Sequence, residues 1–488
     1  MPFVNWQDDP TGPAYPGVPA GYCTHASTLF LPWHRPYIAL YEQILYAYAK
    51  YYVDNMEFKD KLYDRYTQAL QNLRLPYWDW ASDSHLPSIT MQKTIDITVQ
   101  GDNPDTTEIK QIPNPLYSYA FTSKMAMDLI TSELQSPFQN KWSLRCPDVN
   151  GVTHDEIADS QNASVSHRAG IFSLMSIDDF GEFSNTAWSP GHNYDSLESH
   201  HNTIHNFTGG DQSQVPEPSN PVTALPVSGN MEDLWSSSFD PIFWLHHVNV
   251  DRLWAIWQAI HPGSTIDAEL ALFDRWTKAK YVDTKDTGDS HLEPFHKNKK
   301  HDMSSYWLAS DMKEIDSAFN FSYQYPETPF RLLPNRKALA SFANARVWAL
   351  YGPVTEDRSF LGKPISGAPK VDEPAKYRTE WQAFIRAKRF AVPGSWSIHV
   401  FLGEPPKDPA KWISAENRVD SVNIFAPRNI ASCANCQGQN ERGMDVTGAV
   451  YLTDALIKVL HHLPEDKEVS EYLKANLYWT VAKVSFLC

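Results

Sequence analysis

The chain has 488 residues, of which 42 % are hydrophobic and 13 % aromatic, so it can build more than one packed core and two domains are expected. Its formal net charge of -16 excludes the basic excess with which proteins bind nucleic acids or anionic membranes, and small molecules are the expected partners. The five cysteines are too few for a disulfide framework, and neither a secretory leader nor a membrane-spanning apolar run is visible. These features favour a cytoplasmic protein.

In the N-terminal part, apolar residues recur at helical spacing in two stretches. Pro36 suits the first turn of a helix, and apolar residues follow it on one face as far as Tyr48. The stretch 58–73 repeats the pattern. Two amphipathic helices are therefore predicted.

The next two predicted helices carry histidines. The first holds His201 and His205 and should end at the glycine pair 209–210, because glycine favours a helix C-terminus. The second should begin with Asp240 as its N-cap and a proline at the first helical position, and it should end at the His-Pro-Gly of 261–263.

The spacing of these histidines indicates a metal site. His201 and His205 are four residues apart, so both rings lie on one helix face about a turn apart. The neighbouring helix can add a third ring from the pair His246 and His247. Neutral imidazole suits copper, zinc, iron or nickel. The pattern therefore indicates this group of metals but does not select one of them.

The composition changes towards the C-terminus. Residues 351–375 are rich in glycine and proline among charges, which is typical of a linker. A first domain of residues 1–350 and a smaller β-rich domain of residues 376–488 are therefore predicted on either side. The β character rests on β-branched and aromatic residues in three stretches, which are 395–402, 419–425 and 478–486.

Two more histidines, His25 and His34, lie nine residues apart near the N-terminus. Alone, each histidine would be read as an ordinary core or surface residue, but the histidines and their neighbours form a set of motifs. The motifs are Cys23-Thr-His25, Trp33-His-Arg-Pro-Tyr37, Pro76-Tyr-Trp-Asp-Trp80, His201-x3-His205, Asp240-Pro-Ile-Phe-Trp-Leu-His-His-x3-Asp251-Arg252 and Tyr323-x-Tyr325. This set closely resembles the type-3 dicopper proteins, and specifically the fungal tyrosinases.

The resemblance implies a mainly α catalytic domain with a dicopper four-helix-bundle core, followed by the smaller β-rich domain. In the family each copper ion takes three histidines. By resemblance, copper B is held by His201, His205 and His247, and copper A by His25 and His34 as its second and third ligands. The remaining member of the histidine pair, at position 246, would then pack beside the site.

The first copper A histidine of the family precedes a Pro-Phe-x-x-Trp-like run, and this chain begins with Met1-Pro-Phe-Val-Asn-Trp6. The expected ligand would fall before residue 1. Either the sequence is truncated, which the intact remaining motifs favour, or copper A is defective.

Several other residues gain roles through the resemblance. Cys23 would bond through its sulfur to His25 and fix a loop histidine, the alternative being a free buried thiol. Asp251 lies four residues after His247 and can orient that ring or form a salt bridge with an arginine. Phe243 is expected to pack against the site.

The implied chemistry is the ortho-hydroxylation of phenols and the oxidation of o-diphenols to o-quinones with O2. A phenol has a pKa near ~10, so a base must assist, and Glu198 and Asn202 resemble the pair that holds a proton-accepting water in tyrosinases. For Glu198 the alternative is a solvated helix residue.

The C-terminal domain resembles the cap of fungal pro-tyrosinases, which covers the copper site with an aromatic residue. Phe425 is the candidate for that residue, with core packing as its alternative. Cys433 and Cys436 form a Cys-x-x-Cys motif that would assist copper loading, because soft thiolates suit Cu(I). Cleavage within the stretch 355–374 should release the cap.

The sequence therefore predicts a latent tyrosinase or catechol oxidase with two copper ions, acting on O2 and small phenols, without nucleic-acid or membrane partners. The alternatives are an oxygen-binding haemocyanin-like protein and an inactive relative that lacks copper A.

Overall fold

The computed structural model describes most of the chain. The described residues are 5–6, 23–56, 62–103, 105–121, 142–148, 151–188, 193–210, 229–234, 236–264, 266, 269–270, 285–299, 303–352, 380–427, 430, 434–462 and 465–483. Most of the predicted linker, and Cys433, lie outside them.

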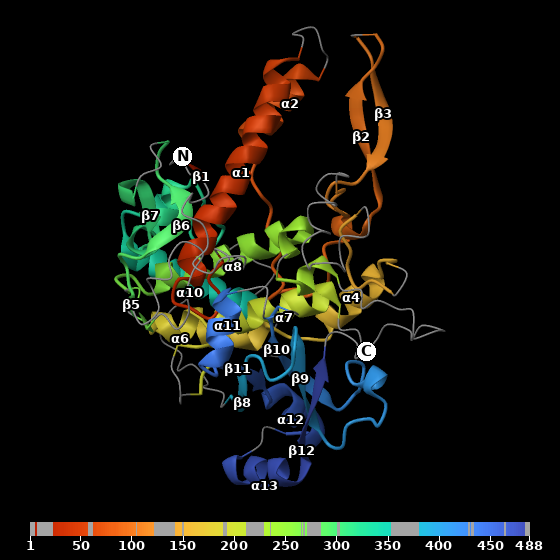
Figure 1. Cartoon of the computed structure of the whole chain (residues 1–488), viewed down its shortest axis with the longest axis vertical. Helices are drawn as coiled ribbons and strands as arrows, with labels where there is room; N and C mark the ends of the chain where they lie inside the picture. The colour runs from red at the N-terminus through yellow and green to blue at the C-terminus, as the bar shows by residue number, and fades with distance from the viewer. Residues whose placement is uncertain are drawn as a thin grey trace.

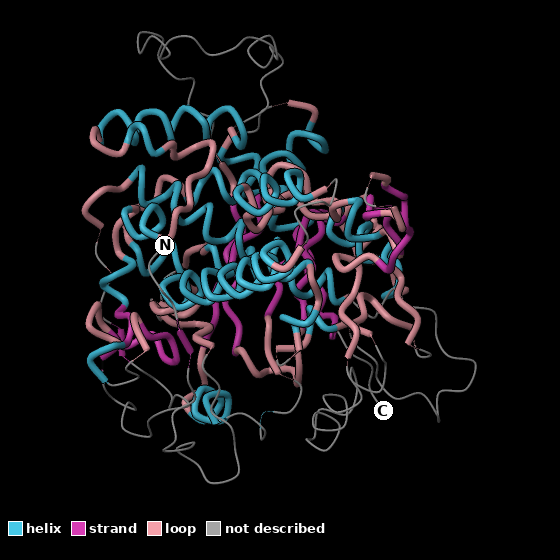
Figure 2. The backbone as a smooth tube through the Cα atoms, turned by 90° about the horizontal axis from the view of Figure 1, so that it is seen from above, coloured by secondary structure: helices cyan, strands magenta, loops and turns pink. Residues whose placement is uncertain are grey.

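A helical domain makes up the first part of the chain, and Figure 2 shows its helices gathered in the middle of the molecule. Helix α8 is its central element and packs against α1, α7 and α10. The buried apolar cluster around it contains large side chains such as Trp80, Trp254 and Trp257. The helices are α1 Phe30–Asp54, α2 Tyr63–Gln71, α4 Asp155–Ala163, α5 Arg168–Leu174, α6 Phe180–Ser184, α7 Leu197–Gly209, α8 Ile242–Ile260, α9 Asp316–Asn320 and α10 Arg336–Tyr351.

Short antiparallel sheets surround these helices. The hairpin β2–β3 projects from the body beside α1 and α2 (Figure 1), and Tyr66 of α2 donates a hydrogen bond of 3.0 Å to the Thr98 carbonyl of β2. The strands of this part are β1 Asn5–Trp6, β2 Thr94–Gln100, β3 Thr107–Pro113, β4 Glu269–Leu270, β5 Lys285–Asp286, β6 His291–His296 and β7 Tyr306–Leu308.

In the described residues of the C-terminal domain, two small antiparallel sheets, ordered β10-β9-β12 and β11-β8, pack together with three helices. Apolar side chains of both sheets form a separate buried cluster. The prediction of a mainly helical domain followed by a smaller β-rich domain is confirmed. The elements are β8 Gln382–Lys388, β9 Trp396–Leu402, β10 Arg418–Ile424, α11 Ala434–Glu441, β11 Asp445–Tyr451, α12 Thr453–Leu460, α13 Asp466–Asn476 and β12 Leu477–Lys483.

The helix bounds confirm some of the predicted signals and correct two. Helix α7 ends at Gly209 and its C-cap Gly210 has φ +109°, a left-handed conformation that glycine adopts readily. The N-cap of α8 is Pro241 and its first helical residue is Ile242, so the predicted N-cap Asp240 lies one residue too early, although its carboxylate accepts a hydrogen bond of 3.1 Å from the Ile242 amide. The prediction that α1 begins at Pro36 is wrong, because α1 begins at Phe30 and contains that proline. Burial of the preceding turn outweighs the missing hydrogen bond of the proline.

Among the described helices, none has the length and hydropathy needed to cross a bilayer.

Candidate metal centre

Histidines from three helices and one loop converge between α1, α7 and α8. One group contains His201 and His205 of α7 with His246 and His247 of α8, and its possible ligand atoms all lie within 4.8 Å of one another. The second group satisfies the same limit and contains Cys23, His25 and His34, of which His34 belongs to α1 and the other two precede it.

The two groups adjoin each other. The ring of His34 stacks on that of His247, with ring centroids 4.7 Å apart and an interplanar angle of 13°. The rings of His25 and His201 are 5.4 Å apart. The structure therefore brings all five sequence-predicted metal ligands into one buried centre.

Several rings are oriented by a hydrogen bond at Nδ1. His34 donates to the Phe30 carbonyl at 2.6 Å, and His205 donates to the Met231 carbonyl at 2.7 Å. His201 pairs with the Asn202 side-chain oxygen at 3.0 Å. Donation from Nδ1 fixes the tautomer and leaves the Nε2 lone pair available, as in most metal-binding histidines.

The opposite nitrogens fit a metal ion. Nε2 of His25 and Nε2 of His201 are buried without a hydrogen-bond partner, and the Nε2 atoms of His205 and His247 face each other at 3.3 Å. A buried nitrogen without a partner costs about 1–3 kcal/mol, so an ion bound at these atoms would remove a destabilising contribution. An imidazole-rich donor set with a nearby sulfur suits copper.

Burial also keeps these rings neutral. It lowers the pKa of His34 to about 4 and that of His205 to about 3. The pKa values of His25, His201 and His247 are lowered well below the ordinary value, again mainly by burial. The neutral ring is the form that binds metals.

His246 is closer to the centre than the sequence suggested. Both of its ring nitrogens are buried without a partner, and its ring stacks on that of His201 with centroids 5.0 Å apart. Because both members of the pair belong to the first group, the choice of His247 as the ligand stays a prediction.

Asp251 forms the salt bridge that was one of its two expected roles. Its carboxylate accepts hydrogen bonds from Arg35 Nε at 2.6 Å and from the Tyr325 hydroxyl at 2.9 Å. Nδ1 of His247 has no hydrogen-bond partner, so Asp251 does not orient that ring. The fully buried guanidinium of Arg35 requires a counter-charge, and that requirement decides the partner of Asp251.

Cys23 lies against the ring to which the thioether would form. Its Sγ is 3.3 Å from His25 Nδ1 and 3.5 Å from His34 Nε2, and it is a free thiol in this structure. Burial, together with the charge of Glu198, raises the pKa of this thiol.

Glu198 is not a solvated helix residue, because only 1 % of it is exposed. Its carboxylate accepts hydrogen bonds from the Ala26 amide at 2.7 Å, the Thr186 amide at 2.9 Å and the Thr186 hydroxyl at 3.1 Å. Burial raises its pKa, while these hydrogen bonds lower it. Glu198 thus fastens the loop that carries His25 to α7.

Phe425 of the C-terminal domain lies on the histidines. Its ring stacks on that of His205 with centroids 4.4 Å apart and an interplanar angle of 22°, and it is 5.5 Å from the ring of His25. Phe425 does not belong to the buried apolar cluster of its own domain. Phe243, as expected, packs on the site from α8, with its ring 4.1 Å from that of His247.

Arg389 was missed by the sequence analysis. It is buried directly after β8, donates a hydrogen bond of 3.0 Å to the Phe425 carbonyl and one of 2.9 Å to Gln439, and its charge acts on Glu198 and Cys23. Arg389 follows Arg386 and Lys388, which are not buried, and nothing in the sequence distinguishes it from them as a buried residue.

The C-terminal domain covers α7 through polar contacts. Asn206 donates to the Ile424 carbonyl at 3.2 Å, and Asn423 donates to the Thr203 hydroxyl at 3.1 Å. Cys436 is buried and disulfide-bonded, so in this state it offers no thiolate to Cu(I).

Comparisons with known proteins agree with this centre. The common central domain of tyrosinase matches residues 1–260, and the tyrosinase C-terminal domain matches residues 380–485. The chain therefore belongs to the tyrosinase family, a family of copper-dependent phenol oxidases.

Among its relatives, a tyrosinase of Neurospora crassa is 29 % identical and aligns with 99 % of this chain and 82 % of its own length. A tyrosinase of Podospora anserina is also 29 % identical, over 90 % of this chain and 81 % of its own. A recombinant mushroom tyrosinase has a similar structure, with a TM-score of 0.73 and 22 % identity over 97 % of this chain and 80 % of that one. An Enteroctopus dofleini haemocyanin aligns with only 49 % of this chain.

Proposed function

We propose that the chain is a latent tyrosinase or catechol oxidase that holds two copper ions and oxidises small phenols with O2. His201, His205 and His247 would hold one ion, and His25 and His34 would contribute to the other. Bound copper would supply the binding and reduction of O2. The support is the convergence of these neutral rings in one buried centre, in which Nε2 of His25 and Nε2 of His201 have no hydrogen-bond partner.

The chain's own residues would position the ligands and move a proton. Asn202 would hold His201 in the tautomer that leaves Nε2 basic, and the proposed thioether of Cys23 would fix the loop histidine. Glu198 and Asn202 would hold a water that accepts the phenolic proton, a step worth typically about 10² to 10⁴ in rate. The raised pKa that burial gives Glu198 suits a base working near neutral pH.

The latency proposal rests on one observation, the stacking of Phe425 on His205 at 4.4 Å. We call the ring of Phe425 the plug. It would lie where the aromatic ring of a substrate has to approach, and it offers no hydroxyl group to be oxidised. Release would follow cleavage between the two domains, and Cys433 and Cys436 would assist copper loading when reduced. A cytoplasmic location is part of the same proposal.

The deciding experiment combines copper content with turnover. Copper per chain is measured after reconstitution, and oxidation of a diphenol and a monophenol is followed before and after limited proteolysis. Turnover of both substrates that rises on cleavage supports the proposal. Reversible O2 binding without turnover would indicate the haemocyanin-like alternative, and one copper ion per chain without turnover would contradict the two-copper proposal for this chain.

A further inference from the structure

The distal half of α1 presents aromatic side chains to solvent. All buried residues of this helix lie at or before Glu42, and the rest projects from the body together with α2 (Figure 1). Tyr48, Tyr51 and Tyr52 are 65 %, 63 % and 70 % exposed. Monomeric proteins rarely expose such a continuous set of large apolar groups, and sets of this kind mark interaction sites.

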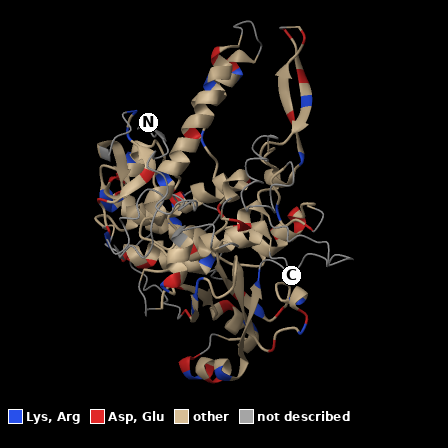
Figure 3. Ribbon diagram, in the orientation of Figure 1, with Lys and Arg blue, Asp and Glu red and all other residues tan. Residues whose placement is uncertain are grey.

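These residues form one stripe. Ile44, Tyr48, Tyr51 and Tyr52 follow the i, i+4, i+7, i+8 spacing of one helix face, and Leu45 borders it. We call these five residues the tyrosine stripe. Between them the helix carries a single charge, the ammonium of Lys50, which pairs with Asp54 one turn later. Figure 3 shows most of α1 in tan, the colour of uncharged residues.

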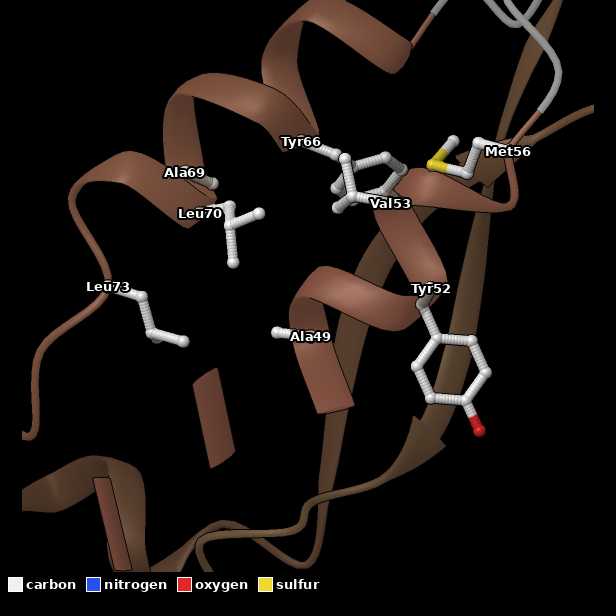
Figure 4. A pocket seen from close by; sticks show the side chains of 8 residues that line it. All are labelled: Ala49, Tyr52, Val53, Met56, Tyr66, Ala69, Leu70 and Leu73. Carbon is white, nitrogen blue, oxygen red and sulfur yellow. The ribbon is translucent and has the colours of Figure 1, made fainter. Parts of the chain in front are cut away.

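An apolar pocket opens beside the stripe between α1 and α2 (Figure 4). Its volume is about 280 Å³, which exceeds the roughly 150 Å³ of an engineered cavity that binds benzene. Tyr52 belongs to both the stripe and the pocket, so a side chain from a partner that covers the stripe can enter the pocket. The lining residues are Ala49, Tyr52, Val53, Met56, Tyr66, Ala69, Leu70 and Leu73.

We propose that the tyrosine stripe is the interface of a homodimer, in which the α1–α2 hairpins of two copies pack across a two-fold axis. The composition and the area of the stripe argue for this occupant. The net charge of -16 opposes contact between two copies over most of the surface, so the favoured place for such a contact is an exposed apolar patch whose single charge is paired, as in this stripe. A two-fold contact also places like against like, which apolar tyrosine rings tolerate and unpaired charges do not.

The available area is sufficient. With about 200 Å² for each tyrosine side chain, the exposed fractions give about 400 Å² on each copy and about 800 Å² across the pair. Ile44, Leu45 and the pocket rim extend this to the roughly 1,000 Å² that a specific interface needs. Two helical hairpins that pack in this way form a four-helix arrangement, a common solution for exposed apolar helix faces.

The test is the mass of the full chain in solution. Sedimentation equilibrium of the wild-type protein at micromolar concentration should give twice 55.6 kDa. The double variant Tyr48→Glu, Tyr51→Glu should be monomeric, with a dimer dissociation constant raised roughly 100-fold or more, because aromatic residues dominate interface energies. Ile109→Glu is the matched control, since Ile109 is 76 % exposed on the neighbouring β3, and it should leave the dimer intact.

A cross-link provides a second readout. Tyr51→Cys should form an intermolecular disulfide under mild oxidation, and circular dichroism should confirm that every variant is folded. A monomeric wild-type chain, or a dimer that survives the double glutamate variant, would overturn the proposal. A monomer that floats with phosphatidylcholine vesicles would overturn it too, and would assign the stripe to a lipid surface.

Discussion

Replacing Phe425 by glycine tests whether the plug is what closes the metal centre. The variant Phe425→Gly removes the ring that stacks on His205 but leaves the backbone and the rest of the domain interface in place. Because the side chain is 98 % buried, its contacts are worth about 1.5–3 kcal/mol in favour of the closed state. That energy corresponds to a change of about 10- to 100-fold in the ratio of closed to open molecules.

The uncleaved variant should therefore oxidise a small diphenol about 10- to 100-fold faster than the uncleaved wild type. Oxygen consumption and quinone absorbance measure this rate at equal copper content. Val422→Ala is the matched control, because Val422 is buried in the core of the same domain on β10 and loses its packing without opening the centre. After cleavage, all three proteins should be equally active. No gain in the uncleaved variant, or the same gain in the control, would refute the role of the plug.

Three further outcomes are expected. Arg389→Ala removes the donor to the Phe425 backbone carbonyl, a hydrogen bond from a charged group worth about 1.5–3 kcal/mol, so the diphenol oxidation rate of the uncleaved chain should rise while that of the cleaved chain stays the same. Asn202→Ala removes the partner of His201 and should lower copper affinity by about 10- to 100-fold in a chelator competition, and an unchanged affinity would count against this role. The metal-free chain should lose stability in thermal unfolding as the pH falls from 6.5 towards 4, because His34 and His205, with pKa values of about 4 and about 3, stay neutral when folded but bind protons when unfolded. If the stability stayed constant or rose as the pH fell over this range, the neutral state of His34 and His205 in the folded chain would be contradicted.

Local sequence patterns predicted much of the metal centre. The four-residue spacing of His201 and His205 could be read from the sequence because a helix places such pairs on one face. The C-cap glycine of α7 and the N-terminal carboxylate of α8 are likewise local signals, and the structure has both helices close to their predicted bounds. The motif resemblance supplied the two histidines outside these helices.

Contacts distant in the sequence could not be predicted. The choice of Asp251 between two partners depends on Arg35, which lies 216 residues away. The position of Arg389 depends on how the C-terminal domain docks, and no periodicity in the chain encodes that docking. The start of α1 was misplaced for a related reason, because burial of the turn before Pro36 is a tertiary effect that overrides the local preference of proline.

Helix α7 contacts both the metal centre and the C-terminal domain that covers it. The polar character of the second contact explains how the two domains can separate. All of its residues are buried, although it carries many polar side chains. His201 and His205 face the metal centre, whereas Thr203 and Asn206 form hydrogen bonds to the C-terminal domain. Loss of the C-terminal domain would return these polar groups to water, which can replace their hydrogen bonds at a small cost in free energy. An interface of this kind resembles a transient contact more than a domain core, so the helical domain can remain folded when the C-terminal domain dissociates.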